Sequence, residues 1–113
     1  MWRIEFSADA EQDFALIFDH LTQAYEDFGE EPEVAFDRAV ARIGAIQDVA
    51  AGLAAQPYQG TLRNDLLDGV RFVRIDKALF WFRPDDDTKV VRVLAVFFGA
   101  QDHINHMMVR LLS

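Results

Sequence analysis

The chain contains no cysteine. This excludes disulfide bonds, thiolate metal sites and cysteine nucleophiles, and it is compatible with a reducing cytoplasm, where we expect the protein to act. Long apolar runs are also missing, since no stretch approaches the length of a membrane span. The opening sequence MWRIEFSADAEQ lacks the basic segment followed by an apolar one that marks a signal peptide. We therefore expect neither membrane insertion nor secretion.

Basic residues are scarce in the first half of the chain. The 113 residues include 11 Lys and Arg against 19 Asp and Glu, for a net charge of −8. Twelve of the acidic residues and three of the basic ones precede Thr61. An acidic protein repels phosphate backbones, so we expect no direct nucleic-acid binding. The alternative role of these carboxylates is to keep two helices soluble.

The most informative segment, residues 69–102, holds three short apolar runs. Turn signals at Asp76-Lys77 and at residues 84–87 separate them. Runs so short and so close together predict an antiparallel meander. The middle run, residues 78–82, contains no polar residue, so we expect it to be buried on both faces.

Helical patterns flank the meander. Residues 2–6 alternate as in a half-buried strand, and Ser7 is a candidate N-cap for a helix that ends at Gly29. Pro32 can open a second helix, and a short amphipathic helix follows Gly99. The residues expected to cover the sheet are Phe14, Ile17, Leu21, Phe36, Val40 and Ile43.

These patterns predict a single α+β domain spanning residues 1–113. Its elements are an N-terminal strand, a helical hairpin, a three-stranded antiparallel meander and a short C-terminal helix. We expect the first strand to join an edge of the meander and complete a four-stranded antiparallel sheet. One sheet face would carry the hairpin, and the last helix would lie across an edge or the open face.

Two histidines are the first candidates for chemistry. His103 and His106 lie three residues apart on the terminal helix, beside Asp102, and could form a metal pair or an acid–base pair. The spacing signals no third ligand, so we interpret them as exposed helix residues and expect no metal or cofactor. The acidic run at residues 85–87 is typical of a solvated turn rather than a cation site.

Four arginines lie on the meander of this acidic chain. Their apolar stems and forked heads suit the recognition of carboxylates on a bound peptide. The alternative is that they pair with nearby aspartates such as Asp65 and Asp68, or with the acidic helices. The four are Arg71, Arg74, Arg83 and Arg92.

Five strings carry a further signal. They are IEFSADAEQDF at residues 4–14, QPYQG at 56–60, GVR at 69–71, LFWFR at 79–83, and RVL at 92–94 followed by GAQD at 99–102. In this order they resemble the RelE/ParE superfamily of bacterial toxin–antitoxin toxins, whose members are also called plasmid stabilisation proteins. The resemblance spans nearly the whole chain.

The resemblance implies one of two activities. RelE-like members are ribosome-dependent mRNA ribonucleases, whereas ParE-like members poison DNA gyrase. The ribonuclease branch places basic residues where this chain has Ala78, Ala100 and Gln101. Metal-free RNA cleavage needs such a cluster, so the sequence favours the ParE-like branch. If the protein were a ribonuclease, its candidate residues would be Arg63, Arg71, Arg83 and His103.

The resemblance also implies a partner. A cognate antitoxin would hold the toxin inactive in a hetero-oligomer, and we expect it to contact the four meander arginines. The toxin would then act by binding rather than by chemistry. An inactive antitoxin-binding module is a further alternative. The expected target-binding residues lie on the terminal helix, because the C-terminal region of ParE-like members matters for activity: His103, His106, Met107 and Arg110.

Overall fold

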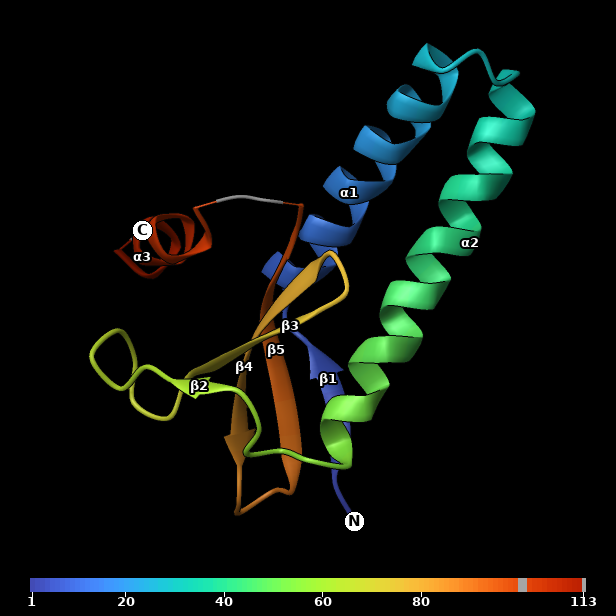
Figure 1. Ribbon diagram of the computed structural model, residues 1–113. Helices are drawn as coiled ribbons and strands as arrows, with labels where there is room; N and C mark the ends of the chain where they lie inside the picture. The colour runs from blue at the N-terminus through green and yellow to red at the C-terminus, as the bar shows by residue number, and fades with distance from the viewer. Residues whose placement is uncertain (100–101, 113) are drawn as a thin grey trace.

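The computed structural model describes residues 1–99 and 102–112. A twisted sheet lies between a long helical hairpin on one side and a short helix on the other (Figure 1). The helices are α1 (Ala8–Asp27), α2 (Pro32–Ala51), the 3-10 turn η1 (Gly52–Ala54) and α3 (His103–Leu112). The strands are β1 (Arg3–Phe6), β2 (Thr61–Leu62), β3 (Arg71–Ile75), β4 (Ala78–Asp85) and β5 (Val90–Phe98). The predicted α+β fold is confirmed.

Strand β4 forms the centre of the molecule, as its lack of polar residues predicted. Strands β3, β4 and β5 form the antiparallel meander, and residues 78–82 are all buried. Phe80 and Phe82 point into the core beneath the hairpin, while Leu79 and Trp81 point into a second core beneath α3. Pro84 belongs to the end of β4 rather than to the expected turn, because it still pairs with Val91.

The sheet has five strands in the order β1-β5-β4-β3-β2. The expected four-stranded antiparallel sheet is wrong in two respects. Strand β2 adds a fifth strand beside β3, and β1 runs parallel to β5, with Arg3 opposite Val90 and Phe6 opposite Val93. Only strands joined by tight turns must be antiparallel. Because the α1–α2 hairpin separates β1 from the rest of the sheet, its connection imposes no direction.

The hairpin covers one sheet face, but α2 uses different residues from those predicted. In α1 the expected Phe14, Ile17 and Leu21 are buried. In α2, Phe36 and Val40 remain 53% and 50% exposed, so their assignment to the core is wrong. Small side chains allow helices to approach closely, which explains why alanines occupy the contact face. The buried residues of α2 are Ala35, Ala39, Ile46 and Ala50, with Ile43 partly buried against them.

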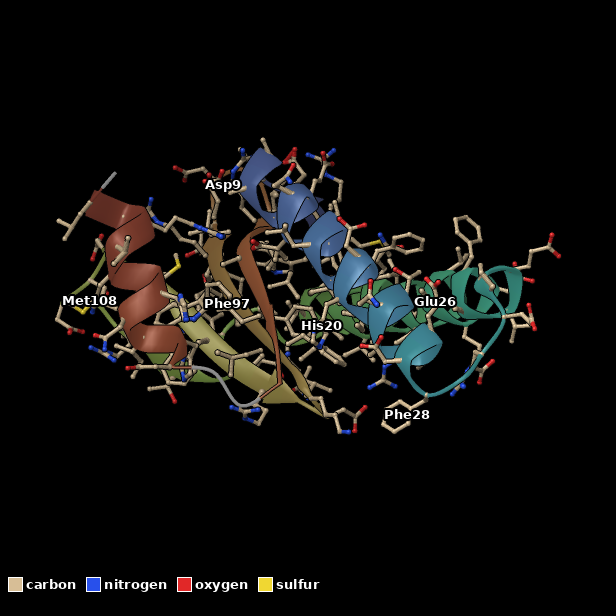
Figure 2. The ribbon with its side chains drawn as sticks, turned by 90° about the horizontal axis from the view of Figure 1, so that it is seen from above. Asp9, His20, Glu26, Phe28, Phe97 and Met108 are labelled. Atoms are coloured by element: carbon tan, nitrogen blue, oxygen red, sulfur yellow. The ribbon has the colours of Figure 1, made fainter. Side chains whose placement is uncertain are left out.

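The last helix lies on the face opposite the hairpin, as the view from above shows (Figure 2). Met107 is only 1% exposed and packs with Trp81, Val70 and Ala95, while Met108 lies on the outer side of α3. Both faces of β4 are therefore covered. No helix in the described part of the chain is long and apolar enough to cross a membrane.

The two buried phenylalanines of β4 should dominate stability. We expect Phe80→Ala or Phe82→Ala to lower the free energy of unfolding by about 3–5 kcal/mol, because each leaves a cavity in a closed core. Phe36→Ala is the matched control, since that ring is half exposed and packs edge-on against Phe18. It should cost less than about 1.5 kcal/mol. Urea denaturation measures all three, and equal losses would contradict the burial of β4.

Candidate functional site

A register shift in the sheet organises the polar residues. Trp81 lies opposite Ala95 but Phe82 lies opposite Val93, so Leu94 is an extra residue on β5. Such a bulge bends the strand and leaves backbone groups unpaired. Strand β1 also ends here, with Phe6 opposite Val93. Beyond this point the side of β5 that faces away from β4 has no strand beside it.

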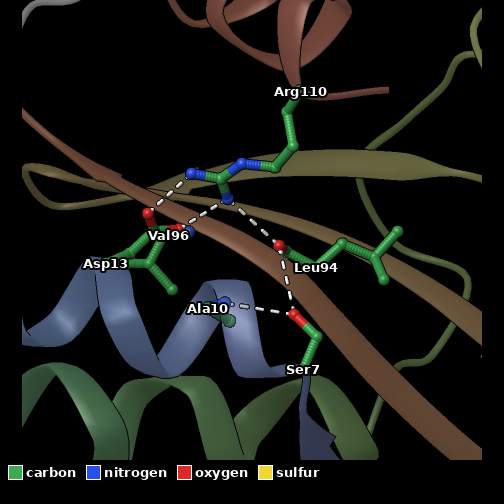
Figure 3. Close-up of polar contacts among 6 residues, drawn as sticks. All are labelled: Ser7, Ala10, Asp13, Leu94, Val96 and Arg110. Carbon is green, nitrogen blue, oxygen red and sulfur yellow. Dashed lines mark hydrogen bonds and ion pairs between the residues drawn. The ribbon is translucent and has the colours of Figure 1, made fainter. Parts of the chain in front are cut away.

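Side chains from α1 and from the residue before it bind the unpaired backbone groups of β5 at this point (Figure 3). The Val96 N–H donates to Asp13 Oδ2 at 2.8 Å, and Ser7 Oγ donates to the Leu94 carbonyl at 3.3 Å. Ser7 Oγ also accepts from the Ala10 N–H at 3.1 Å, which confirms Ser7 as the N-cap of α1. The start of α1 is thereby fixed against the strand.

Arg110 of α3 completes this junction. Its guanidinium forms a two-pronged ion pair with Asp13, at 2.7 and 2.8 Å, and donates to the Leu94 carbonyl at 3.2 Å. Asp13 is 5% exposed, and its hydrogen bonds with Arg110 raise the pKa of the guanidinium. The Arg110 guanidinium is therefore engaged by Asp13 and Leu94, although 26% of its side chain stays exposed. Asp13 was not among the residues predicted from the sequence, although a charged residue within the apolar stripe of α1 indicates a buried partner.

A hollow of about 720 Å³ opens on the sheet face that carries α3, beside the β4–β5 turn. Three exposed arginines line it: Arg3 from β1, Arg83 from β4 and Arg92 from β5. Arg83 and Arg92 are direct cross-strand neighbours. None of the three side chains forms an ion pair or a hydrogen bond with another described residue. The remaining lining residues are Glu5, Leu67, Pro84, Asp85, Asp86, Asp87, Thr88, Val90 and Leu94.

The four meander arginines do not form one surface. Arg71 lies in register with Phe82, and its guanidinium donates to the Tyr58 carbonyl at 2.7 Å. Arg74 is exposed on β3 and lies outside the hollow. Only Arg83 and Arg92 come together, and Arg3, which the sequence did not single out, joins them. The alternative of pairing with Asp65 or Asp68 does not occur for these arginines; Asp65 pairs with Arg63 instead.

His103 is half-buried, so its assignment as an exposed residue is wrong. Its ring lies 4.8 Å from the ring of Phe72 and 5.6 Å from that of Trp81, between centroids. Burial lowers the pKa of its imidazole, and the positive charges of Arg74 and Arg63 act in the same direction against the opposing effect of Asp102. His106 is exposed as expected.

Neither acidic nor histidine clusters form a metal site in the described residues. The run at residues 85–87 builds the turn, where Asp85 Oδ1 accepts from the Asp87 N–H at 3.0 Å. The hollow contains no histidine, tyrosine or lysine. Its arginines can bind anions, and its other ionisable side chains are the carboxylates of Glu5 and residues 85–87. Ala100 and Gln101, which entered the comparison with ribonucleases, lie outside the described residues.

Comparison with known proteins identifies the fold. No protein-family model and no curated protein matches the chain by sequence. Among solved structures, it is similar to a chain of the chromosomal ParDE toxin–antitoxin system of P. aeruginosa, with a TM-score of 0.67 and 19% identity over 88% of this chain and 98% of that one. The RelBE2 toxin–antitoxin complex of Mycobacterium tuberculosis gives 0.58 and 20%, over 88% and 93%. The isolated E. coli RelE toxin gives 0.53 and 10%, over the full length of both.

The fold is therefore the one seen in these chains of ParDE, RelBE2 and RelE. The similarity to a ParDE chain and to RelE spans nearly all of each, so the likeness covers the sheet and the helical hairpin together. The resemblance expected from the five sequence strings is confirmed at the level of fold.

The Asp13–Arg110 pair should contribute strongly to stability. We expect Arg110→Met to lower the free energy of unfolding by about 3 kcal/mol, because it leaves the Asp13 carboxylate buried without its cation. Arg63→Met is the matched control, since it removes an equally two-pronged pair with the exposed Asp65. That change should cost less than about 1 kcal/mol. Urea denaturation of both variants distinguishes the two environments, and similar losses would contradict the role of the junction.

The lowered pKa of His103 should make stability fall in acid. The unfolded chain binds a proton at the ordinary pKa of 6.5, whereas the folded state resists protonation to lower pH. The contribution of His103 is thus present above pH 6.5 and is lost as the pH falls through the folded-state pKa. Between about pH 7 and about pH 5, His103→Gln should lose less stability than the unmodified protein. Urea denaturation at the two pH values measures this. An equal loss of stability in the variant and in the unmodified protein would contradict the prediction.

Proposed function

We propose that the protein is the toxin component of a type II toxin–antitoxin pair. The observation that carries this proposal is the fold, which it shares over nearly the full length of chains from a ParDE system and from a RelBE2 complex. Fold alone does not define activity, so the sites must support it. A cognate antitoxin is the partner that this function requires.

Within the superfamily we propose a ParE-like toxin that inhibits DNA gyrase by binding. Metal-free RNA cleavage requires groups that accept and donate protons at the scissile phosphate. The arginine-lined hollow has no histidine, tyrosine or lysine for this purpose, and His103 is half-buried against aromatic rings with a lowered pKa. Ala78, at the start of the central strand, is buried and apolar. The net charge of −8 also opposes docking on ribosomal RNA.

The terminal helix remains the proposed target surface, with different contact residues. Met107 belongs to the second core and Arg110 to the junction with Asp13, so neither is free to meet gyrase. The outer side of α3 presents Met108 instead. The exposed His106 lies beside the sheet, with its ring centroid 5.8 Å from that of Phe97. Removing α3 altogether would uncover Trp81, so point changes on this outer side are the informative variants.

Purified protein should inhibit supercoiling by DNA gyrase, and its production in bacteria should arrest growth and induce the DNA-damage response. Translating ribosomes should leave mRNA intact in its presence. The measurements are a gyrase supercoiling assay and primer extension on mRNA. Phe80→Ala, which disrupts the core, serves as the inactive control, and Met108→Ala tests the outer side of α3, where that side chain is exposed.

The alternatives predict different results. Defined mRNA cuts with unaffected gyrase would replace the ParE-like assignment with the RelE-like ribonuclease. A folded protein, verified by circular dichroism, that shows neither activity would be an inactive antitoxin-binding module.

A further inference from the structure

Two arginines face each other across the sheet without a partner. Arg83 of β4 lies directly opposite Arg92 of β5, and residues directly opposite on one face have Cβ atoms about 5 Å apart. Like charges in this arrangement repel and destabilise a sheet. Arg3 of the neighbouring strand adds a third positive charge to the same hollow.

The protein has many carboxylates, yet none in the described part of the chain forms an ion pair with these three guanidinium groups. Glu5 is the register partner of Arg92 in the parallel β1–β5 pair but makes no ion pair with it. Asp85 accepts hydrogen bonds from its own turn. Asp86 accepts from the Tyr58 hydroxyl and lies 3.9 Å from the Lys89 ammonium. The described residues therefore leave the three guanidinium groups available to a ligand.

The hollow has the size and chemistry of a binding site. Its volume of about 720 Å³ falls within the range of about 300–1,000 Å³ typical of ligand sites. Leu67, Val90 and Leu94 give it apolar walls, and the arginines supply forked donors. A guanidinium binds a carboxylate or a phosphate through two parallel hydrogen bonds.

We propose that this hollow binds the carboxylates of an acidic peptide segment from a partner protein. Four carboxylates line the hollow beside the three arginines: Glu5, Asp85, Asp86 and Asp87. A continuous phosphate backbone would be repelled by these groups along its length. A peptide can place separate acidic side chains on the arginines and neutral ones beside the aspartates. The mixed lining thus favours a peptide over a nucleic acid.

The cognate antitoxin is the proposed source of this segment, and that attribution rests on the proposed toxin function. The binding site itself does not depend on the proposed toxin function. Its residues differ from the set expected from sequence, because Arg71 and Arg74 are excluded and Arg3 is added. The binding measurement uses purified protein and a synthetic peptide, so its failure leaves gyrase inhibition untouched, and failure of gyrase inhibition leaves the site untouched.

The probe is a fluorescently labelled peptide of alternating glutamate and serine, measured by fluorescence anisotropy at low ionic strength. Arg83→Gln and Arg92→Gln should each weaken binding about tenfold or more, because each removes a charge-assisted pair of hydrogen bonds. Arg74→Gln is the matched control, since it removes the same charge from a strand arginine outside the hollow. It should change binding less than about twofold.

The same variants report on folding. Removing either opposed arginine relieves repulsion, so the melting temperature should stay unchanged or rise. Parallel titrations use a glutamine-for-glutamate version of the peptide, an oligouridine RNA and inorganic phosphate. Three results would each overturn the proposal. They are tighter binding of RNA than of the acidic peptide, equal peptide binding by all three variants, and no peptide binding by the unmodified protein.

Discussion

The structure depends on one buried carboxylate. Asp13 receives the Val96 N–H from β5 and the guanidinium of Arg110 from α3, while its own helix is fixed by the Ser7 cap. These contacts hold the two helical layers to opposite sides of one strand. They are needed because β1 is too short to pair with all of β5 and because the bulge at Leu94 frees backbone groups there. Burying the Asp13 carboxylate costs free energy of desolvation. Its hydrogen bonds with Val96 and Arg110 offset that cost only when both partners are in place. The helices and the sheet therefore constrain one another through a single site.

Local patterns were sufficient for much of this fold. The apolar run of β4, the cap at Ser7 and the alternation in β1 depend on near neighbours in sequence, and each element was predicted. The packing of α2 could not be predicted in this way. Phe36 and Val40 form a plausible helical stripe, yet the sheet and α1 accept the alanine face beside it. Which of two adjacent stripes is buried depends on how closely two helices approach, and hydrophobicity alone does not determine that distance.

The arginine hollow could not be predicted from the sequence. Without the bulge, Arg83 would lie opposite Val93 rather than Arg92, and Leu94 would face the hairpin. One inserted residue thus creates the opposed pair. Arg3 joins only because β1 runs parallel to β5, a direction that its distant connection leaves open. The four meander arginines looked equivalent in sequence, but strand register divides them between two faces and two ends of the sheet.

The Asp13–Arg110 pair also affects when the chain can fold during its synthesis. The partners are separated by 97 positions, and Ser7 meets the Leu94 carbonyl across 87. A growing chain that has produced α1 and α2 therefore carries an uncompensated carboxylate on the very face that should enter the core. The hairpin cannot pack on the sheet until β5 has been made. Asp13 cannot form its ion pair with Arg110 until α3 has followed. Contacts between residues so far apart in the chain are slow to form. The nascent chain is thus kept from its folded shape until α3 has been made.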